Sequence, residues 1–299
     1  MIDAHVHLMT MEMLEDAIKR FEKNYPGSDK QIRKSGHKIF ADKSMKYISG
    51  TSLKEKADDW LKVMDENGIE KAVFFPISQR PEQVRDFMAN SPERLYGYAF
   101  INDPASHDAP DVLKSGVNEY GLCGLKLYPS IQLFHAYDKK LFALYEEAQG
   151  LGVPITFHYG ITHAPMADYR YTNPLDLQLP LRLFPKLNFI IAHFGAGFFR
   201  EVCLLGYHTK NLYLDTSGTN NWTEYTPENW KLKEVFKRAI EIYSPERIIF
   251  GTDTVLRPDT GYRTSIMKEQ LNVVEALGIS SGETDLIFGG NAKRLYFTP

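Results

Sequence analysis

Eight short apolar runs alternate along this chain with longer amphipathic segments. The runs lie at residues 2–8, 70–77, 95–101, 122–128, 153–158, 187–193, 212–216 and 247–250. Because most of them are apolar on both faces, they predict strands of a parallel sheet that helices cover from outside. Eight such strand–helix units in 299 residues predict one closed (β/α)8 barrel, a TIM barrel, that occupies residues 1–299 as a single domain.

The segments between the runs carry helical periodicity and helix-end signals. Helices are predicted at residues 52–67, 81–90, 109–120, 138–149, 173–184, 198–207, 229–243, 263–277 and 281–296. Asn173 is expected to cap its helix, with Pro174 in the first helical position. An open, doubly wound sheet is the alternative arrangement. No glycine-rich phosphate loop follows the first run, which disfavours that alternative.

Residues 9–50 form a long polar stretch after the first predicted strand. It contains a helical pattern at residues 11–23 and otherwise has weak periodicity. Stretches of this length inside a compact domain are usually functional or mobile. We therefore predict an insertion, residues 9–50, which either folds over the mouth of a site or remains a solvated loop.

Composition excludes several classes of function. The chain has 35 basic and 38 acidic residues and a net charge of −3, so it lacks the basic excess that nucleic acids or anionic membranes attract. Two cysteines are too few for a disulfide framework. No signal peptide precedes the first strand and no apolar run approaches the length of a membrane span, so a cytoplasmic protein is expected. Its partner is expected to be a small-molecule substrate, and a homo-oligomer is compatible with the sequence.

The first predicted strand carries two histidines with one residue between them. Side chains at positions i and i+2 of a strand point to the same face, so His5 and His7 should lie side by side. Neutral imidazole is the commonest metal ligand among side chains. The alternate residues Ile2, Ala4, Val6 and Leu8 are expected on the opposite face, against helices.

Polar residues also stand at the ends of four later strands. These are Lys126 and Tyr128 on the fourth, His158 on the fifth, His193 on the sixth and Asp253 after the eighth. The active sites of such barrels form at the carboxyl ends of the strands, so these side chains are expected to converge with His5 and His7. Three protein ligands and an open position for water make a catalytic zinc site. His193 would be a nearby proton carrier or a further ligand.

These motifs, in this order, resemble the amidohydrolase superfamily, and specifically the amidohydrolase-2 branch that includes aminocarboxymuconate-semialdehyde decarboxylase. The matching elements are Asp-Ala-His5-Val-His7, His158, Ile-Ala-His193-Phe-Gly, Gly-Thr-Asp253 and the closing Gly290-Asn-Ala-Lys-Arg-Leu295. The resemblance spans essentially the whole chain. It implies that His5, His7, His158 and Asp253 bind one divalent metal, usually zinc, and that His193 is the catalytic histidine together with Asp253.

The resemblance leaves the role of Lys126 open. Relatives outside this branch hold two metals that are bridged by a carboxylated lysine on the fourth strand, where Lys126 lies. A second metal would follow if Lys126 were carboxylated. The alternatives are an unmodified lysine that holds a substrate anion, which we favour, or a lysine that extends to solvent.

Two reactions suit such a site. In the favoured one, a metal-dependent hydrolase, metal-activated water attacks the carbonyl of an ester, lactone or amide, Asp253 takes a proton and His193 polarises the oxygen or protonates the leaving group. The alternative is a metal-dependent decarboxylase of a small carboxylic acid, in which Asp253 or His193 moves the proton and Arg170 or Arg257 holds the carboxylate. A non-catalytic binding protein on the same scaffold is the third option.

Several further residues are predicted to face the substrate because they follow the strands at the same end of the barrel. They are Lys126, Tyr128, Tyr159, His163 and Arg257. The remaining histidines fall in predicted loops or helices and are expected at the surface. They are His37, His107, His135 and His208.

Overall fold

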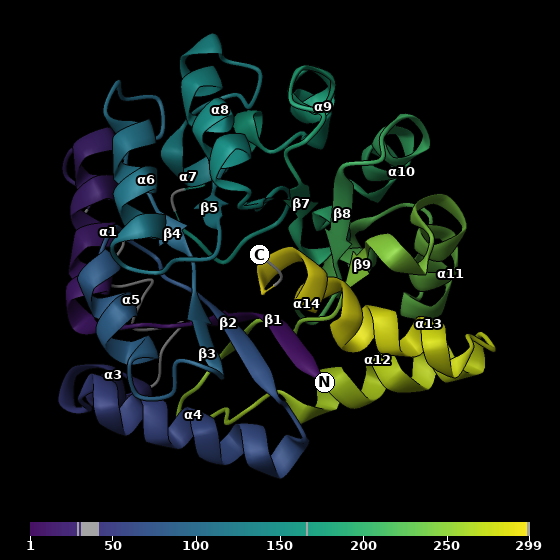
Figure 1. The fold of residues 1–299 in the computed structure, drawn as a ribbon, viewed down its shortest axis with the longest axis horizontal. Helices are drawn as coiled ribbons and strands as arrows, with labels where there is room; N and C mark the ends of the chain where they lie inside the picture. Colours follow the sequence, from purple (N-terminus) through teal and green to yellow (C-terminus); the bar gives the residue numbers. More distant parts are fainter. Residues whose placement is uncertain (29, 31–41, 166, 298–299) are drawn as a thin grey trace.

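Short parallel strands arranged in a ring form the centre of the molecule, and helices surround them (Figure 1). The computed structural model describes residues 1–28, 30, 42–165 and 167–297. The strands are β1 (Ile2–His7), β2 (Lys71–Phe75), β3 (Leu95–Gly97), β4 (Ala99–Phe100), β5 (Leu125–Leu127), β6 (Ile155–Phe157), β7 (Phe189–Ile191), β8 (Leu212–Asp215), β9 (Ile248–Ile249) and β10 (Thr254–Val255).

Two parallel sheets make up the ring, in the orders β10-β1-β2-β3 and β4-β5-β6-β7-β8-β9. β3 and β4 are separated only by Tyr98, and β9 and β10 only by residues 250–253. Backbone hydrogen bonds continue the pairing at both breaks, from Tyr98 N to Phe74 O and from Ala4 N to Phe250 O, each 3.0 Å long. The ring therefore has eight strand positions, and the predicted (β/α)8 barrel is confirmed.

The helices form where the sequence predicts them, with ends that differ by a few residues. Their bounds are α1 (Met11–Asn24), α3 (Asp42–Gly50), α4 (Leu53–Asn67), α5 (Pro81–Met88), α6 (Ala109–Asn118), α7 (Pro129–Gln132), α8 (Phe142–Leu151), α9 (Gln178–Leu183), α10 (Phe199–His208), α11 (Leu232–Tyr243), α12 (Thr264–Ala276), α13 (Ser281–Asp285) and α14 (Asn291–Tyr296). Local capping explains the starts of several of them. Ser52 and Glu55 form a reciprocal capping box before α4, and Asn173 caps a short 3₁₀ turn at Pro174–Leu177 that leads into α9. None of the helices in the described part of the chain is both long and apolar enough to span a membrane.

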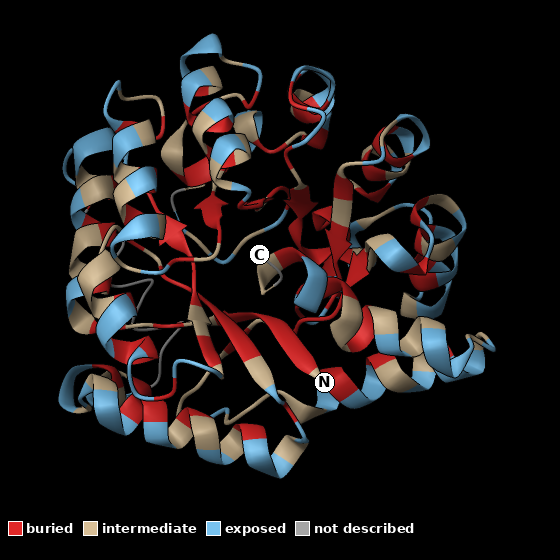
Figure 2. Ribbon diagram, in the orientation of Figure 1, coloured by how far each residue is buried: buried red, intermediate tan, exposed pale blue. Residues whose placement is uncertain are grey.

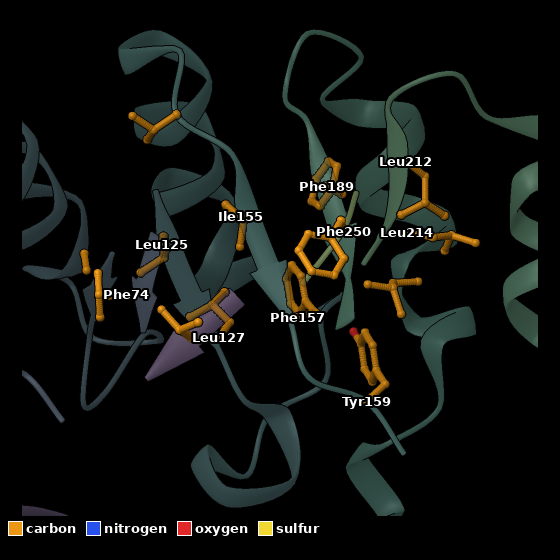
Figure 3. Packing of buried hydrophobic residues seen from close by; sticks show 14 of the residues in the cluster. Phe74, Leu125, Leu127, Ile155, Phe157, Tyr159, Phe189, Leu212, Leu214 and Phe250 are labelled. Atoms are coloured by element: carbon orange, nitrogen blue, oxygen red, sulfur yellow. The ribbon is translucent and has the colours of Figure 1, made fainter. Parts of the chain in front are cut away.

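The outward faces of the strands build the main hydrophobic core (Figure 3). Residues two apart on one strand share a face, and such pairs on β5, β6 and β8 are completely buried beneath the helices. These pairs are Leu125 with Leu127, Ile155 with Phe157, and Leu212 with Leu214. The strands are buried throughout the ring, whereas the helices expose their outer faces (Figure 2). The ring therefore holds its strand ends in fixed relative positions.

β1 departs from the simple alternation that its sequence predicts. Its pairing with β2 shifts register between Asp3 and Val6. Val6 joins the main core, as expected, but Ile2 and Ala4 join a separate cluster with residues of β7, β9 and α14. The prediction that Ile2, Ala4, Val6 and Leu8 share one face is therefore wrong. The cause is the irregularity in β1, which exchanges the faces of the residues before and after it.

The separate cluster closes the amino-terminal end of the barrel. It consists of Ile2, Ala4, Ile190, Ile249, Ala292 and Leu295, all of which are buried. α14 supplies the last two and lies across the centre of the ring in Figure 1. We call this group the base cluster. The single helix predicted at residues 281–296 is interrupted here by a π-helical turn at Leu286–Gly290, because Asn291 N bonds to Leu286 O and leaves Ile287 O to accept the Phe250 N–H.

The stretch after β1 contributes two described helices, α1 and α3, that contact loops at the carboxyl ends of the strands. Ile18 and Phe21 of α1 pack with Phe100 and Ile131, and Arg20 donates to the carbonyl oxygen of Ile77. In α3, Ser44 hydrogen-bonds to Asp259, in the loop between β10 and α12. Both helices therefore border the mouth of the barrel. Residues 29 and 31–41 of the predicted insertion, His37 among them, lie outside the described part of the chain.

Candidate metal centre

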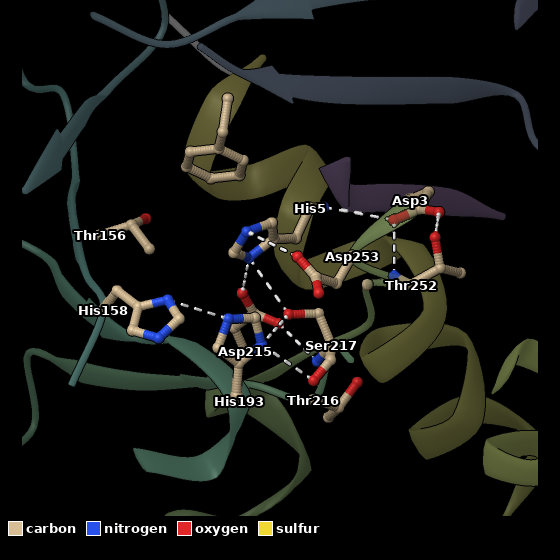
Figure 4. A network of polar contacts seen from close by, with 12 residues as sticks. Asp3, His5, Thr156, His158, His193, Asp215, Thr216, Ser217, Thr252 and Asp253 are labelled. Carbon is tan, nitrogen blue, oxygen red and sulfur yellow. Dashed lines mark hydrogen bonds and ion pairs between the residues drawn. The ribbon is translucent and has the colours of Figure 1, made fainter. Parts of the chain in front are cut away.

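The carboxyl ends of β1, β6, β7 and β9 bring the predicted site residues together (Figure 4). Asp253 Oδ1 lies 3.0 Å from His7 Nε2 and 3.8 Å from His5 Nε2, and His193 Nε2 lies 3.2 Å from His158 Nδ1. The ring centroids of His5 and His193 are 5.0 Å apart. These five side chains come from positions separated by as many as 248 residues along the chain, and the closed barrel is what makes them neighbours.

His5 is completely buried, and its two ring nitrogens differ in their surroundings. Nδ1 contacts the Asp215 carboxylate at the end of β8, whereas Nε2 has no hydrogen-bond partner among the described residues. Burial, reinforced by the positive charge of Lys126, lowers the pKa of His5 well below its usual value, so the ring is neutral at pH 7. A neutral ring with an unpartnered buried nitrogen is the form of histidine that binds a metal.

The close approach of strand ends at His5 requires a glycine at position 251. A Cβ atom there would lie 2.8 Å from the Cβ of His5 and 2.9 Å from the Cβ of Ser217, closer than such atoms approach in proteins. Gly251 therefore lets the end of the eighth strand position pass directly beside His5. That passage places Asp253 next to both histidines of β1.

Asp253 is held by contacts on both of its oxygens. Oδ1 faces His7, and Oδ2 accepts a hydrogen bond of 3.1 Å from Arg263. Burial acts to raise the pKa of Asp253, but the hydrogen bond from His7 and the neighbouring histidines outweigh it and hold that pKa well below its usual range. The residue is therefore an anion. Its backbone is left-handed, with a φ of 57°, which is uncommon for a residue other than glycine.

His193 lies in a left-handed turn rather than at the end of a regular strand. Every residue from 193 to 197 has a positive φ, and His193, Phe194 and Ala196 are not glycines. Each such residue costs roughly 1–2 kcal/mol, so the turn persists only because its surroundings impose it. The carbonyl oxygen of Ala196 accepts the Ile161 N–H, which ties this turn to the loop after β6. Strain of this kind concentrates at functional sites.

His158 and His193 face each other with nitrogens that both lack a proton. His158 Nε2 lies 3.2 Å from the carbonyl oxygen of Ile161, and His193 Nδ1 lies 3.0 Å from that of Ser217. A carbonyl can only accept, so each proton belongs on those nitrogens. Burial lowers the pKa of both rings, which leaves His158 Nδ1 and His193 Nε2 as opposed lone pairs. Such a pair calls for a cation between its members.

The donor atoms fit one divalent metal ion. Among the described residues, one group of His, Cys, Asp or Glu has all its ligand atoms within 4.8 Å of one another, and it consists of His5, His193 and Asp253. Two nitrogens bound at zinc distances on a tetrahedral ion lie about 3.3–3.4 Å apart, close to the 3.2 Å between His158 and His193. The compact group thus includes His193, which we expected to be a catalytic residue, in place of the expected ligands His7 and His158.

Lys126 lies inside the barrel beside these residues. It is 3% exposed, its Nζ has no hydrogen-bond partner among the described residues, and the Phe75 ring centroid lies 4.8 Å away. Burial lowers its pKa to about 8, although the charges of Asp215 and Asp253 oppose the shift. A lysine that extends to solvent is therefore excluded. What remains is a buried cation that lacks a bonded anion.

The structure separates the other predicted substrate residues. Tyr128 stacks on His158 with ring centroids 4.1 Å apart, and its hydroxyl bonds to Thr162. Tyr159 is buried in the main core and stacks on Phe157, so it does not face the site. The physical reason is strand alternation, because Tyr159 shares the outward face of Phe157 while His158 points inward.

Two other predicted substrate residues lie in mouth loops. His163 is exposed, and Arg257 is half-buried next to Arg263 in the loop before α12. Arg170, which we considered as a carboxylate partner, is exposed and paired with Asp168. Of the histidines expected at the surface and described here, His107 and His208 are exposed and His135 is half-buried against Asp176.

Sequence reasoning missed three residues that contact the site. Asp215 and Ser217 follow β8 and contact His5 and His193, and Arg263 contacts Asp253. A signal for the first two was present, since polar residues at a strand end are what identified the other members. Arg263 carries no such signal, because it reaches Asp253 only through the path of the loop between β10 and α12.

Asp3 also proves to lie outside the site. Its carboxylate accepts hydrogen bonds from the Thr252 N–H and hydroxyl and from the Tyr262 hydroxyl, at 3.0, 2.6 and 2.8 Å. The register shift in β1 turns it toward α12 rather than toward His5. Asp3 is thus an anchor between the first strand and the loop that carries Asp253 and Arg263.

Solved structures of similar fold match nearly the whole chain. A 5-carboxyvanillate decarboxylase from Novosphingobium aromaticivorans, in complex with manganese and a nitrobenzoic acid, is 14% identical over 98% of this chain and 95% of its own, with a TM-score of 0.69. A probable 2-pyrone-4,6-dicarboxylic acid hydrolase from Acinetobacter baumannii is 14% identical over 98% of each chain, with a TM-score of 0.63. A 4-oxalomesaconate hydratase from Rhodopseudomonas palustris is 19% identical over 99% and 95%, with a TM-score of 0.62. At these identities the likeness shows the fold.

The sequence itself supports a more definite assignment. A search of curated proteins finds no match to the chain. The model of the amidohydrolase family, however, matches residues 2–298. Its members are enzymes, and the candidate site lies where a barrel enzyme carries its active site. The chain belongs to the amidohydrolase family, in the amidohydrolase-2 branch.

Proposed function

We propose that this protein is a metal-dependent hydrolase that cleaves an ester, lactone or amide bond of a small carboxylate-bearing molecule. The observation that carries the proposal is the unpartnered, buried Nε2 of His5, which points into a group of neutral histidines beside the ionised Asp253. A divalent cation would satisfy all of these atoms at once. Zinc suits this set of nitrogens and a carboxylate, and manganese is the alternative.

His5, His7 and Asp253 would hold the ion together with one member of the His158–His193 pair. Such an ion supplies a Lewis acid and a water molecule of lowered pKa. The other member of the pair would then be free to accept a proton on its ring nitrogen and to return it to the leaving group. We propose His193 for this proton transfer, because its Nε2 lies between His158 and the Asp253 side of the site.

Asp253 is better suited to hold the ion than to move protons. Arg263 occupies its second oxygen, and the low pKa makes the carboxylate a weak base. This modifies our expectation that Asp253 takes the proton of the attacking water. In the proposed mechanism Asp253 orients the site, and the histidine pair carries the proton.

Lys126 would bind an anionic group of the substrate. Its buried ammonium has no bonded anion among the described residues, and a carboxylate placed beside it would relieve the cost of that burial. The similar structures named above act on 5-carboxyvanillate, 2-pyrone-4,6-dicarboxylic acid and 4-oxalomesaconate, all of which are carboxylic acids. That common feature supports a carboxylate-bearing substrate for this chain. Tyr128, His163 and Arg257 remain candidates for contacts at the rim.

Decarboxylation is the second candidate, and the position of Lys126 favours it as well. A carboxylate held by this lysine would lie next to the metal-type residues, where loss of carbon dioxide could be assisted. The TM-score of 0.69 with a decarboxylase is slightly higher than the 0.63 with a hydrolase, but the difference is too small to decide. The two reactions differ in their products, and this difference provides the test.

The test combines metal analysis with product analysis. Elemental mass spectrometry on the purified protein should find about one divalent ion per chain, and dialysis against a chelator should remove both the ion and the activity. Two ions per chain would instead indicate that Lys126 is carboxylated and bridges them. Substrate screening should include 2-pyrone-4,6-dicarboxylate and 5-carboxyvanillate. Acid release without gas indicates hydrolysis, whereas carbon dioxide indicates decarboxylation. Failure to bind any divalent ion after reloading would refute both.

A further inference from the structure

We infer that Asp215 is a positioning residue that fixes the proton of His5 on Nδ1 and so keeps Nε2 available to a metal. This inference rests on the proposed metal site and adds a residue to it that no sequence motif had singled out. Asp215 lies at the end of β8 and is 4% exposed, so its carboxylate is shielded from water. Its contacts are therefore those that the protein provides.

Each oxygen of Asp215 has a defined partner. Oδ1 accepts the backbone N–H of Ser217 at 2.6 Å, and Oδ2 faces His5 Nδ1. The Ser217 N–H can only donate, so the atom at the Oδ1 position must be an acceptor. The arrangement has one orientation, because a rotation of the carboxyl group would break both contacts. Asp215 is therefore held by the backbone, and it in turn holds the ring of His5.

A carboxylate that faces a ring nitrogen determines which nitrogen carries the proton. Because an ionised carboxylate can only accept, the neutral His5 ring must place its single proton on Nδ1. Nε2 then keeps its lone pair, and it is this atom that has no partner among the described residues. Carboxylate–histidine pairs behind metal ligands act in this way and also make the ligand more basic.

His193 offers a comparison within the same site. Its Nδ1 lies 3.0 Å from the backbone oxygen of Ser217 and 2.8 Å from the hydroxyl of the same residue. The segment from Asp215 to Ser217 thus orients both rings. His5 is supported by a charged carboxylate, whereas His193 is supported by neutral oxygens. The structure therefore assigns His5 as the stronger ligand and leaves His193 better able to exchange a proton.

An asparagine at position 215 should reverse the tautomer of His5. Ser217 N–H would select the amide oxygen for the Oδ1 position, which turns the amide nitrogen toward His5 Nδ1. That nitrogen is a donor, so Nδ1 would have to accept and the ring proton would move to Nε2. Asp215→Asn would then point an N–H into the metal site. Asp215→Ala removes the carboxylate without imposing the wrong tautomer.

The experiment compares these two variants with the wild type in the metal-free and metal-titrated protein. Two-dimensional NMR on protein with ¹⁵N-labelled histidine reports which ring nitrogen of His5 carries the proton. Calorimetric titration with Zn²⁺ and Mn²⁺ reports the affinity. We expect Asp215→Asn to move the proton to Nε2 and to weaken metal binding by about 10–100-fold, with Asp215→Ala weakened less.

Asp176→Asn provides the matched control. Asp176 Oδ2 contacts His135 Nδ1 at 2.8 Å, so it forms the same kind of pair away from the metal-type residues. This variant should bind both metals like the wild type. Thermal unfolding of all variants identifies any that fail to fold, and the Ala variant then carries the test.

The outcomes separate this inference from the proposed function. If Asp215→Asn keeps the Nδ1 proton on His5 and binds metal within about twofold of the wild type, the inference is overturned. Equal losses of affinity in the Asn and Ala variants would also overturn it, because loss of charge alone would then suffice. If the wild type binds no metal, the proposed function fails, while the NMR measurement on metal-free protein still decides the tautomer.

Discussion

The two ends of the barrel are built from opposite kinds of side chains. At the amino-terminal end, the base cluster joins Ile2, Ala4 and Ile249 to Ala292 and other apolar residues in complete burial. At the carboxyl end, buried polar atoms of His5 and Lys126 lack partners among the described residues, and the backbone is left-handed at His193 and Asp253.

This difference shows how one set of strands serves two purposes. Apolar packing at the base stabilises the fold, since it removes hydrocarbon from water and leaves no polar group unsatisfied. Uncompensated charge and strained backbone at the mouth cost stability, so their presence indicates a ligand that completes the site. Four substitutions would break or sharpen this contrast between the ends.

The largest effect is expected at the mouth, from Asp253→Asn. The substitution removes the anion that faces His7 and His5, so turnover should fall by at least about 1,000-fold, in line with the loss of an essential electrostatic group. The thermal unfolding midpoint should stay near that of the wild type. Steady-state kinetics with the substrate found in the screen measures the first, and circular dichroism the second. Near-normal turnover would end the proposed mechanism.

A substitution at the base should do the reverse. Ile249→Ala leaves a cavity in the base cluster and should lower the free energy of unfolding by about 3 kcal/mol. The metal affinity of the folded protein should not change, because Ile249 contacts none of the metal-type side chains. Urea denaturation and calorimetric titration measure the two quantities. A loss of metal affinity as large as the loss of stability would show that the two ends are not independent.

Lys126→Met should stabilise the metal-free protein, by about 2 kcal/mol at pH 7, because it removes a buried charge. The folded pKa of about 8 lies below the usual 10.5. Below pH 8 both states hold the proton. Between pH 8 and 10.5 only the unfolded state holds it, so wild-type stability rises with pH and the advantage of the variant shrinks. Denaturation curves at pH 7 and pH 10 check this. A destabilised variant would mean that Lys126 has a structural role.

The smallest effect is expected for Tyr128→Phe. Stacking on His158 survives the change, and only the hydroxyl contact with Thr162 is lost, so stability should fall by about 1 kcal/mol. KM should change by less than about twofold if Tyr128 orients His158 without touching the substrate. A larger rise in KM with unchanged kcat would restore Tyr128 as a substrate contact.

The order of strands and helices could be predicted from the sequence because it depends on local patterns. Apolar runs predict buried strands, and caps such as Ser52 and Asn173 predict where helical turns begin. The polar residues at strand ends predicted where the site would form. His5, His7, His158, His193 and Asp253 do come together at the carboxyl end of the barrel.

Other features could not be predicted because they depend on contacts between distant segments. The register shift in β1 separates Ala4 from Val6 and turns Asp3 away from His5, and no local pattern announces it. The left-handed turn at His193 is equally hidden, because the ordinary preferences of its residues oppose it. Tyr159 is a different case, since alternation with Phe157 would have placed it in the core.

The sequence by itself determined the barrel and the chemical types of the side chains at its mouth, since strand periodicity and side-chain identity are local properties. Only the tertiary structure decided which nitrogen faces which oxygen. Asp215 meets His5 across 210 positions of the chain, and Arg263 reaches back to Asp253 around a loop. The choice of ligand atoms depends on these contacts, which exist only once the ring of strands has closed.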